Sequence, residues 1–374
     1  MSGLNLDSIL AEATQKASQE IGKVNILVAG SAGVGKSTLI NAVFGAEVAI
    51  TGVGEAQTKS TTAHERAGSP LKIYDTRGFE IANSDATVGG VRRCIQDLRR
   101  STDENDQIHL VWTCILEQSH RIEPVHQNLL TMVHQLRVPS IVVITQALGD
   151  PEMETRVREL AVPNDRVIAV LAEPKKIAGF EIPATGLSEL IENSLALVPK
   201  ARRAAFIAAQ SARWDLKEQE VFRVINETAI LSAGSALIPI PGGHSVALIG
   251  LQAKLIAQIN SILGIGLDES GSKEIAKGML GIMLAKTGGT LAFTELMRLV
   301  PGVGWFGAAM IGGPVGGAAT KVFGHLYYQS VVDYARKNQP LPSATVVAQE
   351  IERNFQSNRS HYESLLSEPG EANG

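Results

Sequence analysis

Cysteine is scarce in this sequence of 374 residues, which contains only Cys94 and Cys114. The two lie twenty positions apart and form no CxxC pair, so the sequence offers neither a disulfide framework nor a set of zinc ligands. The first twenty residues contain no apolar core flanked by basic residues, and we expect no secretion signal. These absences favour a reducing compartment, so we expect a cytoplasmic protein; the cytoplasmic face of a membrane stays open as an alternative.

An excess of positive charge is also missing. The 34 basic and 38 acidic side chains give a formal net charge of -4, so no large positive field attracts a phosphate backbone. We therefore expect no nucleic acid among the partners. Aromatic residues make up only 5% of the chain, but the hydrophobic share of 44% supplies enough apolar material for a sizeable core. At roughly 150 residues per domain, the length predicts two or three domains.

Charged residues are distributed unevenly along the chain. Asp, Glu, Lys and Arg are absent from 228–253 and again from 299–320, and both segments belong to a part rich in Gly and Ala. The strand-like apolar segments end near residue 200, where we place a domain boundary. The expected division is an N-terminal helix over 1–22, an α/β domain over 23–198, a helical domain over 199–366 and a loose tail over 367–374.

Short β-rich segments alternate with helix-forming segments in the first half, which is typical of a mostly parallel sheet covered by helices. The expected strands are 23–30, 71–76, 109–116, 140–145 and 166–172. The expected helices are 36–44, 85–100, 122–136 and 187–198. The second half predicts an all-helical bundle, with a long helix over 201–227, an apolar helix over 246–263 and a last helix that starts after Ser343 and ends near Leu366.

A phosphate-binding motif follows the first expected strand. Residues 30–37 spell GSAGVGKS, which matches G-x-x-x-x-G-K-[ST] between a strand and a helix. Its glycines let the backbone curl so that successive N–H groups point at a phosphate, at the positive end of the following helix. Lys36 then reaches the β- and γ-phosphates, and the Ser37 hydroxyl is a ligand for Mg²⁺. The alternative, an ordinary Gly-rich turn, is disfavoured by the flanking strand and helix.

A nucleoside triphosphatase of this type also needs an acid at the end of a second strand. Asp75 ends the segment LKIYDT, and the amide of nearby Gly78 can sense the γ-phosphate. The intervening segment 45–65 carries several hydroxyl side chains that can close over Mg²⁺. These candidates are Thr58, Ser60, Thr61 and Thr62.

Together these motifs resemble those of the translation-factor-like GTPases, the Era and TrmE group, over residues 23–198, and the segment 45–65 is similar to the immunity-related GTPases. The resemblance implies a P-loop GTPase domain that hydrolyses GTP to GDP and phosphate, with Mg²⁺ held by Ser37, Thr58 and Asp75. It also implies that Lys36, Thr58, Gly78 and Glu80 act in hydrolysis. The nucleotide-binding residues that it implies are Gly30, Ser31, Ala32, Gly33, Val34, Gly35, Lys36, Ser37, Thr38, Asp75, Gly78, Thr145, Gln146 and Ala172.

The base-recognition segment departs from the pattern N/T-K-x-D of that family. Thr145-Gln146-Ala147-Leu148 keeps a polar first residue, but leucine accepts no hydrogen bond from guanine. Asp150, two residues further on, is an alternative acceptor, and an ATPase of altered base specificity stays open as a second hypothesis. The last base-contacting segment of the family corresponds to Leu171-Ala172-Glu173, where the Ala172 amide can serve without a serine.

The position after Gly78, which holds a water-orienting glutamine in Ras-like enzymes, is occupied by Phe79. A phenyl ring cannot orient water, so we expect slow intrinsic hydrolysis unless Glu80, Arg77 or a partner subunit supplies the missing group. Two hypotheses remain: nucleotide-driven assembly that completes catalysis, or a slow or non-hydrolysing interaction module that awaits an activator.

The C-terminal half, over residues 199–335, resembles a helical domain of undefined function that follows GTPase domains in bacterial proteins, some of them membrane-associated. Prolines and glycines break the charge-free segments 228–253 and 299–320, so each predicts a buried or re-entrant hairpin. A soluble bundle core and membrane insertion both stay open. We expect GTP and GDP to control self-assembly, as a homodimer or larger oligomer, or membrane association through this domain.

Overall fold

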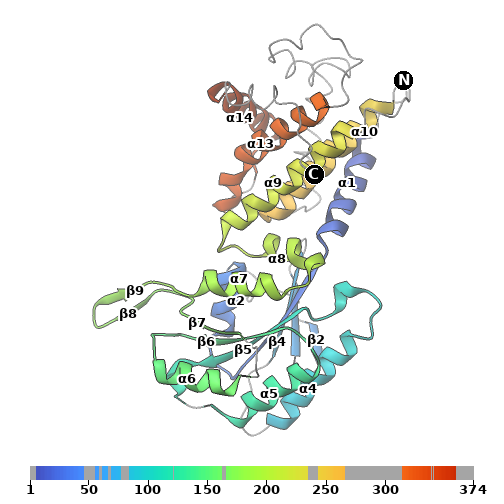
Figure 1. The fold of residues 1–374 in the computed structure, drawn as a ribbon. Helices are drawn as coiled ribbons and strands as arrows, with labels where there is room; N and C mark the ends of the chain where they lie inside the picture. Colours follow the sequence, from blue (N-terminus) through green and yellow to red (C-terminus); the bar gives the residue numbers. More distant parts are fainter. Residues whose placement is uncertain are drawn as a thin grey trace. The chain divides into compact units, whose positions relative to one another are not determined.

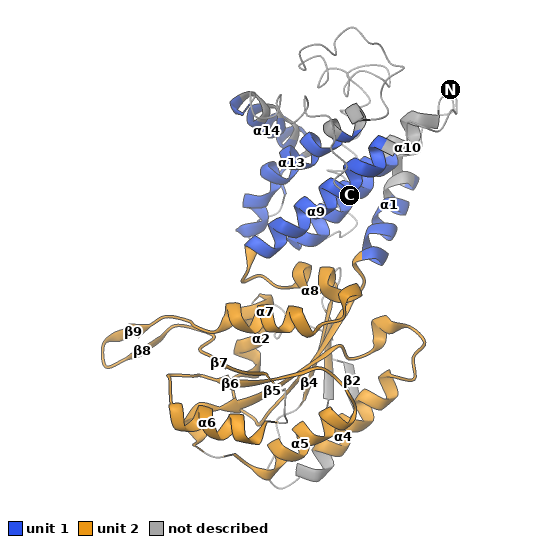
Figure 2. Cartoon of the chain, viewed as in Figure 1, with its two compact units in different colours: residues 1–20, 215–374 blue, residues 21–214 orange. Residues whose placement is uncertain are grey.

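The computed structural model describes residues 6–45, 55–58, 61–65, 69–76, 84–120, 122–161, 166–234, 243–265, 314–337, 339 and 341–358. The chain divides into two compact units, one of residues 21–214 and one of residues 1–20 with 215–374 (Figure 2). The first is an α/β unit and the second is a helical unit (Figure 1). The predicted fold class is therefore confirmed. The domain bounds predicted from the sequence stay predictions; the two units change over at residues 214–215.

A seven-stranded sheet in the order β2-β3-β4-β1-β5-β6-β7 forms the centre of the α/β unit. The pairs from β4 to β7 are parallel, whereas β2–β3 and β3–β4 are antiparallel. Parallel neighbours need crossover connections, which here are mostly helices. The strands are β1 (Val24–Ala29), β2 (Glu55–Thr58), β3 (Thr61–Glu65), β4 (Leu71–Thr76), β5 (Leu110–Leu116), β6 (Ser140–Thr145) and β7 (Arg166–Val170).

Helices cover both faces of this sheet (Figure 1). One face carries α4 (Ser84–Leu98), α5 (Pro124–Gln135) and α6 (Pro151–Leu160); the other carries α2 (Lys36–Phe44), α7 (Leu187–Leu197) and α8 (Arg203–Ala209). Because neither face meets water, every residue of β1 and β6 is buried. On the α2 side, the Phe44 ring stacks on Trp112 with 5.6 Å between centroids and meets Phe206 edge-on at 6.0 Å.

The helix predicted over 201–227 is wrong at residues 210–213, where the chain leaves α8 before α9 (Trp214–Gly234) begins. The Gln210 side chain supports this break, since its Nε2 donates to Arg213 O at 2.8 Å and its Oε1 accepts from Arg213 N at 2.7 Å. The Ser211 N–H donates to Val43 O at 2.8 Å, near the end of α2. Tertiary hydrogen bonds thus outweigh the helical pattern of this segment.

Some elements were not predicted at all. They are β2, β3, α6 and a two-stranded hairpin of β8 (Lys175–Ile177) and β9 (Phe180–Ile182). The hairpin projects from the α/β unit (Figure 1) and turns through Ala178 and Gly179, both with positive φ as a tight hairpin turn requires. The strands β2 and β3 lie inside the segment 45–65, whose hydroxyl-rich sequence lacks the apolar alternation that identifies a strand.

The helical unit contains most of α1 (Leu6–Ile21) and α9, together with α10 (Gly243–Leu263), α13 (Pro314–Arg336) and α14 (Ala344–Ser357). Buried polar pairs join these helices: Gln252 Nε2 donates to Thr320 Oγ1 at 2.9 Å, and the Tyr327 hydroxyl donates to Asn260 Oδ1 at 2.9 Å. Such bonds specify which helices pair. In the part of the chain that the structure describes, no helix has the length and apolar character to span a membrane. Residues 235–242 and 299–313 of the predicted hairpins lie outside the described residues.

Candidate functional site

The residues predicted to bind phosphate, magnesium and base lie at one edge of the sheet. Strands β4, β1, β5, β6 and β7 run parallel, so their carboxyl ends share this edge. Ligands of open α/β sheets bind in the crevice outside the carboxyl ends of the strands. The edge brings together the phosphate loop (residues 30–37), Asp75, Thr145, Gln146 and Ala172. Their individual roles stay predictions.

The phosphate loop connects β1 to α2 and depends on glycine at two positions. A Cβ on Gly30 would lie 2.7 Å from the Cys114 carbonyl oxygen, closer than real Cβ atoms come. Gly35 precedes α2 with φ 95 and ψ 17, a left-handed conformation that side chains disfavour. Lys36 is only 8% exposed, and its Nζ donates to Gly30 O at 3.0 Å and to Ser31 O at 3.1 Å. The ammonium group is therefore held over the loop, at the positive end of α2.

Thr145 links the base side of the site to the phosphate loop. Its Oγ1 lies 2.6 Å from Val34 O and 3.2 Å from Ile115 O. A hydroxyl has one proton, so the shorter contact to Val34 receives it. Next to it, the Gln146 side chain lies beside Gly35, with Nε2 3.7 Å from the position of a Cβ there.

The two predicted base segments are also joined to each other. The Ala147 N–H donates to Val170 O at 3.1 Å, and Leu171 continues into a pair of backbone hydrogen bonds with Thr185. Ala172 therefore follows directly from a strand end that is bonded to the segment 145–148. The remaining predicted phosphate residues, Ala32, Gly33, Ser37 and Thr38, lie in the loop or at the start of α2, where Ser37 is exposed.

Asp75, near the end of β4, fits a role beside a metal ion. Its Oδ1 is buried and has no hydrogen-bond partner among the described residues. Burial raises the pKa of this carboxyl, while the nearby charges of Lys36 and His64 oppose the rise. A buried acceptor of this kind fits a water molecule of a Mg²⁺ hydration shell, and the exposed Ser37 hydroxyl fits a direct ligand. The residues present thus suit Mg²⁺.

Thr58 lies at the same carboxyl edge of the sheet, but two strands away from β4, which carries Asp75. It ends β2 and pairs with Thr61, which in turn pairs with Thr76 of β4. Two strand spacings correspond to about 10 Å between Thr58 and Thr76. Residues 77–83, which include the predicted Gly78, Phe79 and Glu80, lie outside the described residues.

Asp150 is bound in a way that disfavours the role considered for it as a guanine acceptor. Its Oδ1 accepts from Glu152 N at 3.0 Å and Met153 N at 3.2 Å, which caps α6, and its Oδ2 lies 3.1 Å from His120 Nδ1. The hydrogen bond from Met153 N is the main cause that lowers the pKa of this carboxyl. Both oxygens therefore already have partners within the protein.

Sequence reasoning missed Glu117, which follows directly after β5. Its side chain is 5% exposed and accepts hydrogen bonds from the backbone of residues 148–150, next to the predicted base segment. The available signal was an acidic residue placed immediately after a buried, mostly apolar strand, where burial without a partner is costly.

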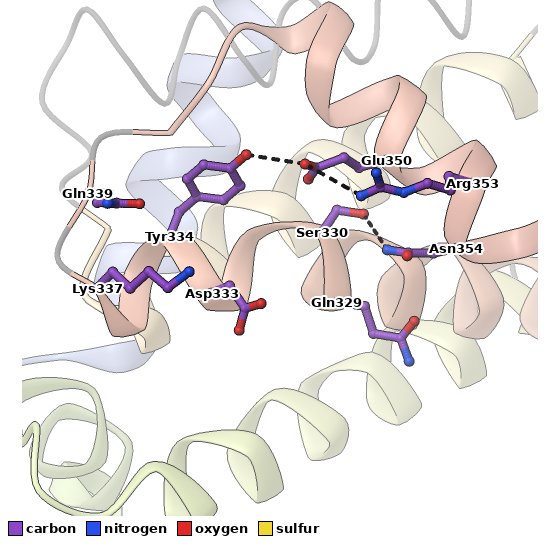
Figure 3. Close-up of a pocket in the computed structure, with 9 residues that line it drawn as sticks. All are labelled: Gln329, Ser330, Asp333, Tyr334, Lys337, Gln339, Glu350, Arg353 and Asn354. Atoms are coloured by element: carbon purple, nitrogen blue, oxygen red, sulfur yellow. Dashed lines mark hydrogen bonds and ion pairs between the residues drawn. The ribbon is translucent and has the colours of Figure 1, made fainter. Parts of the chain in front are cut away.

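A polar cavity of about 340 Å³ belongs to the helical unit and lies along α13 and α14 (Figure 3). Within it, Glu350 accepts from the Tyr334 hydroxyl at 3.1 Å and lies 3.8 Å from Arg353, and Asn354 donates to Ser330 at 3.2 Å (Figure 3). The Tyr334–Glu350 and Ser330–Asn354 hydrogen bonds join α13 to α14, which stabilises the contact between the two helices. The residues that line the cavity are Gln329, Ser330, Asp333, Tyr334, Lys337, Gln339, Glu350, Arg353 and Asn354.

Comparison with known proteins gives a family for the segment that carries this site. Residues 25–146 match the model of the family described as 50S ribosome-binding GTPase. The tRNA modification GTPase MnmE of Polaromonas naphthalenivorans is 38% identical over 90 residues, which are 24% of this chain and 19% of that protein. MnmE of Paraburkholderia xenovorans is 26% identical over 224 residues, which are 58% of this chain and 47% of that protein. The chain thus spans less than half the length of these relatives.

Among solved structures, a variant of Era from Aquifex aeolicus bound to GDP and aluminium fluoride is 20% identical, with a TM-score of 0.32 over 48% of this chain and 58% of that one. A complex of Era with MgGDPNP and a segment of 16S ribosomal RNA is 18% identical, with a TM-score of 0.31 over the same shares. The family match covers the phosphate loop, Asp75 and the strand that ends at Thr145. Residues 25–146 therefore match a P-loop GTPase of this family, with MnmE as a distant relative over part of its length.

Proposed function

We propose that this chain binds GTP with Mg²⁺ at the carboxyl edge of its sheet and hydrolyses it to GDP and phosphate. The observation that carries the proposal is the phosphate loop, in which Lys36 is held at the positive end of α2, near the half-buried Asp75 carboxyl. Lys36 and the loop amides would stabilise the charge of the phosphoryl group during transfer. Ser37 and Thr58 would be ligands of Mg²⁺, with Asp75 in its outer shell.

In this proposal, the position of Thr58 depends on which nucleotide is bound. It lies about 10 Å from Thr76 when β2 is paired in the sheet, so a direct bond to Mg²⁺ needs the segment 55–58 to move. Binding of the γ-phosphate and Mg²⁺ would favour that movement, and hydrolysis would release it. Gly78 and Glu80 complete the proposed catalytic residues, and Phe79 in place of a glutamine supports a low intrinsic rate.

Guanine is the proposed base because the matched family consists of GTPases. Leu148 keeps adenine open, since it cannot accept the two guanine N–H groups. A titration with GDP and with ADP decides between the two. Tighter binding of GDP supports the proposal, and equal or tighter binding of ADP replaces it with the ATPase hypothesis.

The helical unit would convert the nucleotide state into assembly or membrane attachment, as a homodimer or larger oligomer. This part of the proposal is motivated by the charge-free segments 228–253 and 299–320. Sedimentation of the protein with and without anionic lipid vesicles, in GTP, in GDP and without nucleotide, tests it. We expect the state with GTP to sediment differently from the other two; identical behaviour in all conditions contradicts this role.

The description of the matched family names the 50S ribosome, and the Era complex contains a segment of 16S ribosomal RNA. Those names weaken the expectation that this chain binds no nucleic acid, although its net charge of -4 still argues against strong electrostatic attraction. An electrophoretic mobility assay with ribosomal RNA at low salt tests the expectation. A shifted band would overturn it.

Phosphate release from GTP tests the central activity directly. Replacing Ser37→Ala removes a proposed Mg²⁺ ligand, so we expect release to fall and its dependence on Mg²⁺ to weaken. The control is Ser101→Ala, which removes a hydroxyl that bonds Asp106 before β5, at the amino edge of the sheet. Absence of phosphate release by the unmodified protein at every protein concentration would support the non-hydrolysing hypothesis instead.

A further inference from the structure

The Glu117 carboxylate accepts hydrogen bonds from three successive backbone N–H groups of a single loop. Its Oε2 accepts from Leu148 N at 2.5 Å, and its Oε1 accepts from Gly149 N at 3.1 Å and Asp150 N at 3.0 Å. A carboxylate that accepts N–H groups makes hydrogen bonds stronger than those of a neutral acceptor. With 5% of the residue exposed, water competes little for these bonds. Three successive backbone donors are therefore directed inward, away from the solvent.

The loop that Glu117 holds follows directly from the segment where the base is proposed to bind. The same loop is fixed at its start by Thr145, which donates to Val34 O, and at Ala147, whose N–H donates to Val170 O at 3.1 Å. Between these two points Gln146 adopts a positive φ of 51, and its side chain lies beside Gly35 of the phosphate loop. The shape of the base segment is thus set by the phosphate loop, by β7 and by Glu117.

Neither of the two positions considered for a guanine-accepting carboxylate supplies one. Asp150 caps α6 and pairs with His120, and position 148 is a leucine that is 40% exposed. Base selection at this edge therefore depends on groups of the segment 145–148 itself, such as the Gln146 amide and the backbone. Their positions are defined only while the loop keeps one conformation.

We propose that Glu117 is a positioning residue for base recognition, which fixes the segment 145–150 in the conformation that accepts a purine. The inference rests on the proposed function, since it requires that a nucleotide binds at this edge. Glu117 does not touch the nucleotide in this scheme. It acts through the backbone of residues 148–150 and leaves the phosphate loop unaffected.

The test is Glu117→Gln, which keeps the size of the side chain but removes its charge and places an NH₂ donor against backbone N–H groups. We expect the affinity for GDP to fall by about tenfold or more, because hydrogen bonds to a charged group are lost from the loop. Inorganic pyrophosphate, which contacts only the phosphate loop, should bind the variant as it binds the unmodified protein. The ratio of GDP to ADP affinity should move toward one.

Two further variants make the result specific. Glu117→Asp keeps the charge on a shorter side chain and should recover part of the GDP affinity. Asp103→Asn is a matched control, since Asp103 also accepts a backbone N–H, from Asn105 at 2.8 Å, in the segment before β5 at the amino edge of the sheet. It should leave the affinities for GDP and pyrophosphate unchanged.

The outcomes separate this inference from the proposed function. If the unmodified protein binds GDP and Glu117→Gln binds it equally well, the positioning role is refuted while the proposed function stands. Equal loss of GDP and pyrophosphate binding in Glu117→Gln also refutes it, because the residue would then support the whole site. If the unmodified protein binds neither ligand, the proposed function fails first, and the inference fails with it. Where Glu117→Gln does not fold, Glu117→Asp decides by the same comparison.

Discussion

The hydrogen bond from Thr145 to the phosphate loop can be tested with a pair of substitutions of identical chemistry. Thr145 is 3% exposed and donates to Val34 O at 2.6 Å. Thr113, one strand away on β5, is fully buried, and its Oγ1 has no partner among the described residues. Replacing either threonine by valine exchanges a hydroxyl for a methyl of similar size and keeps a good strand former.

Thr145→Val should lower the free energy of unfolding, whereas Thr113→Val should leave it unchanged or raise it. Thr145→Val leaves the buried Val34 carbonyl without this donor and should cost about 1–3 kcal/mol. Thr113→Val removes a hydroxyl that loses its water on folding and gains no bond, so it should be neutral or stabilising by about 1 kcal/mol. We therefore expect a difference of about 1–4 kcal/mol between the variants.

Urea unfolding followed by circular dichroism measures this difference. Because the chain has two compact units, its unfolding need not be a single transition. The transition to compare is the one whose midpoint moves to a higher urea concentration when excess GDP is added. Thr145→Val should also bind GDP more weakly, because the phosphate loop loses a fixed point, whereas Thr113→Val should not. Equal shifts in stability for the two variants, or a larger loss for Thr113→Val, would refute the reasoning.

Two other predictions follow from the α/β unit. Gly30→Ala should weaken GTP binding, measured by calorimetric titration, by about tenfold or more, since a Cβ 2.7 Å from Cys114 O must displace the phosphate loop or β5. The control is Gly89→Ala in α4, where the atom nearest to the new Cβ would lie 3.9 Å away. This variant should keep full affinity in the same titration. Burial lowers the pKa of His109 from 6.5 to about 4, and its Nδ1 accepts from Asn25 N, so the unfolded chain binds a proton there that the folded chain rejects. Stability should consequently fall as pH drops below 6.5, with roughly 2 kcal/mol lost at this residue between pH 7.5 and pH 5. His109→Gln should flatten that part of the pH profile of urea unfolding, and an unchanged profile would contradict the assignment.

Much of this site was predictable because it depends on local patterns. The segments that became β1, β5 and β6 are buried almost throughout and therefore form nearly continuous hydrophobic stretches. The phosphate loop was predictable because its backbone needs glycine, as the close approach of Gly30 to Cys114 demonstrates. Both signals are contained within a few consecutive residues.

The features that were missed depend on residues far apart in the chain. Glu117 meets its backbone partners 31 to 33 positions later, and backbone N–H groups leave no trace in the sequence. Ser211 interrupts a helical pattern because it bonds Val43, which lies 168 positions earlier. The strands β2 and β3 gain their stability from β4, against which β3 pairs, and their own sequence lacks an apolar face.

The central claim is that the phosphate loop holds the phosphates of a nucleotide through Lys36. Isothermal titration calorimetry with GTP and Mg²⁺ tests it on three proteins: the unmodified chain, Lys36→Ala and Lys23→Ala, the last removing an exposed lysine that pairs with Glu65 at the amino edge of the sheet. The account predicts binding by the unmodified chain and by Lys23→Ala, and affinity at least about a hundredfold lower for Lys36→Ala. It is contradicted if the unmodified chain releases no heat with any purine nucleotide, or if Lys36→Ala binds GTP as tightly as the unmodified chain.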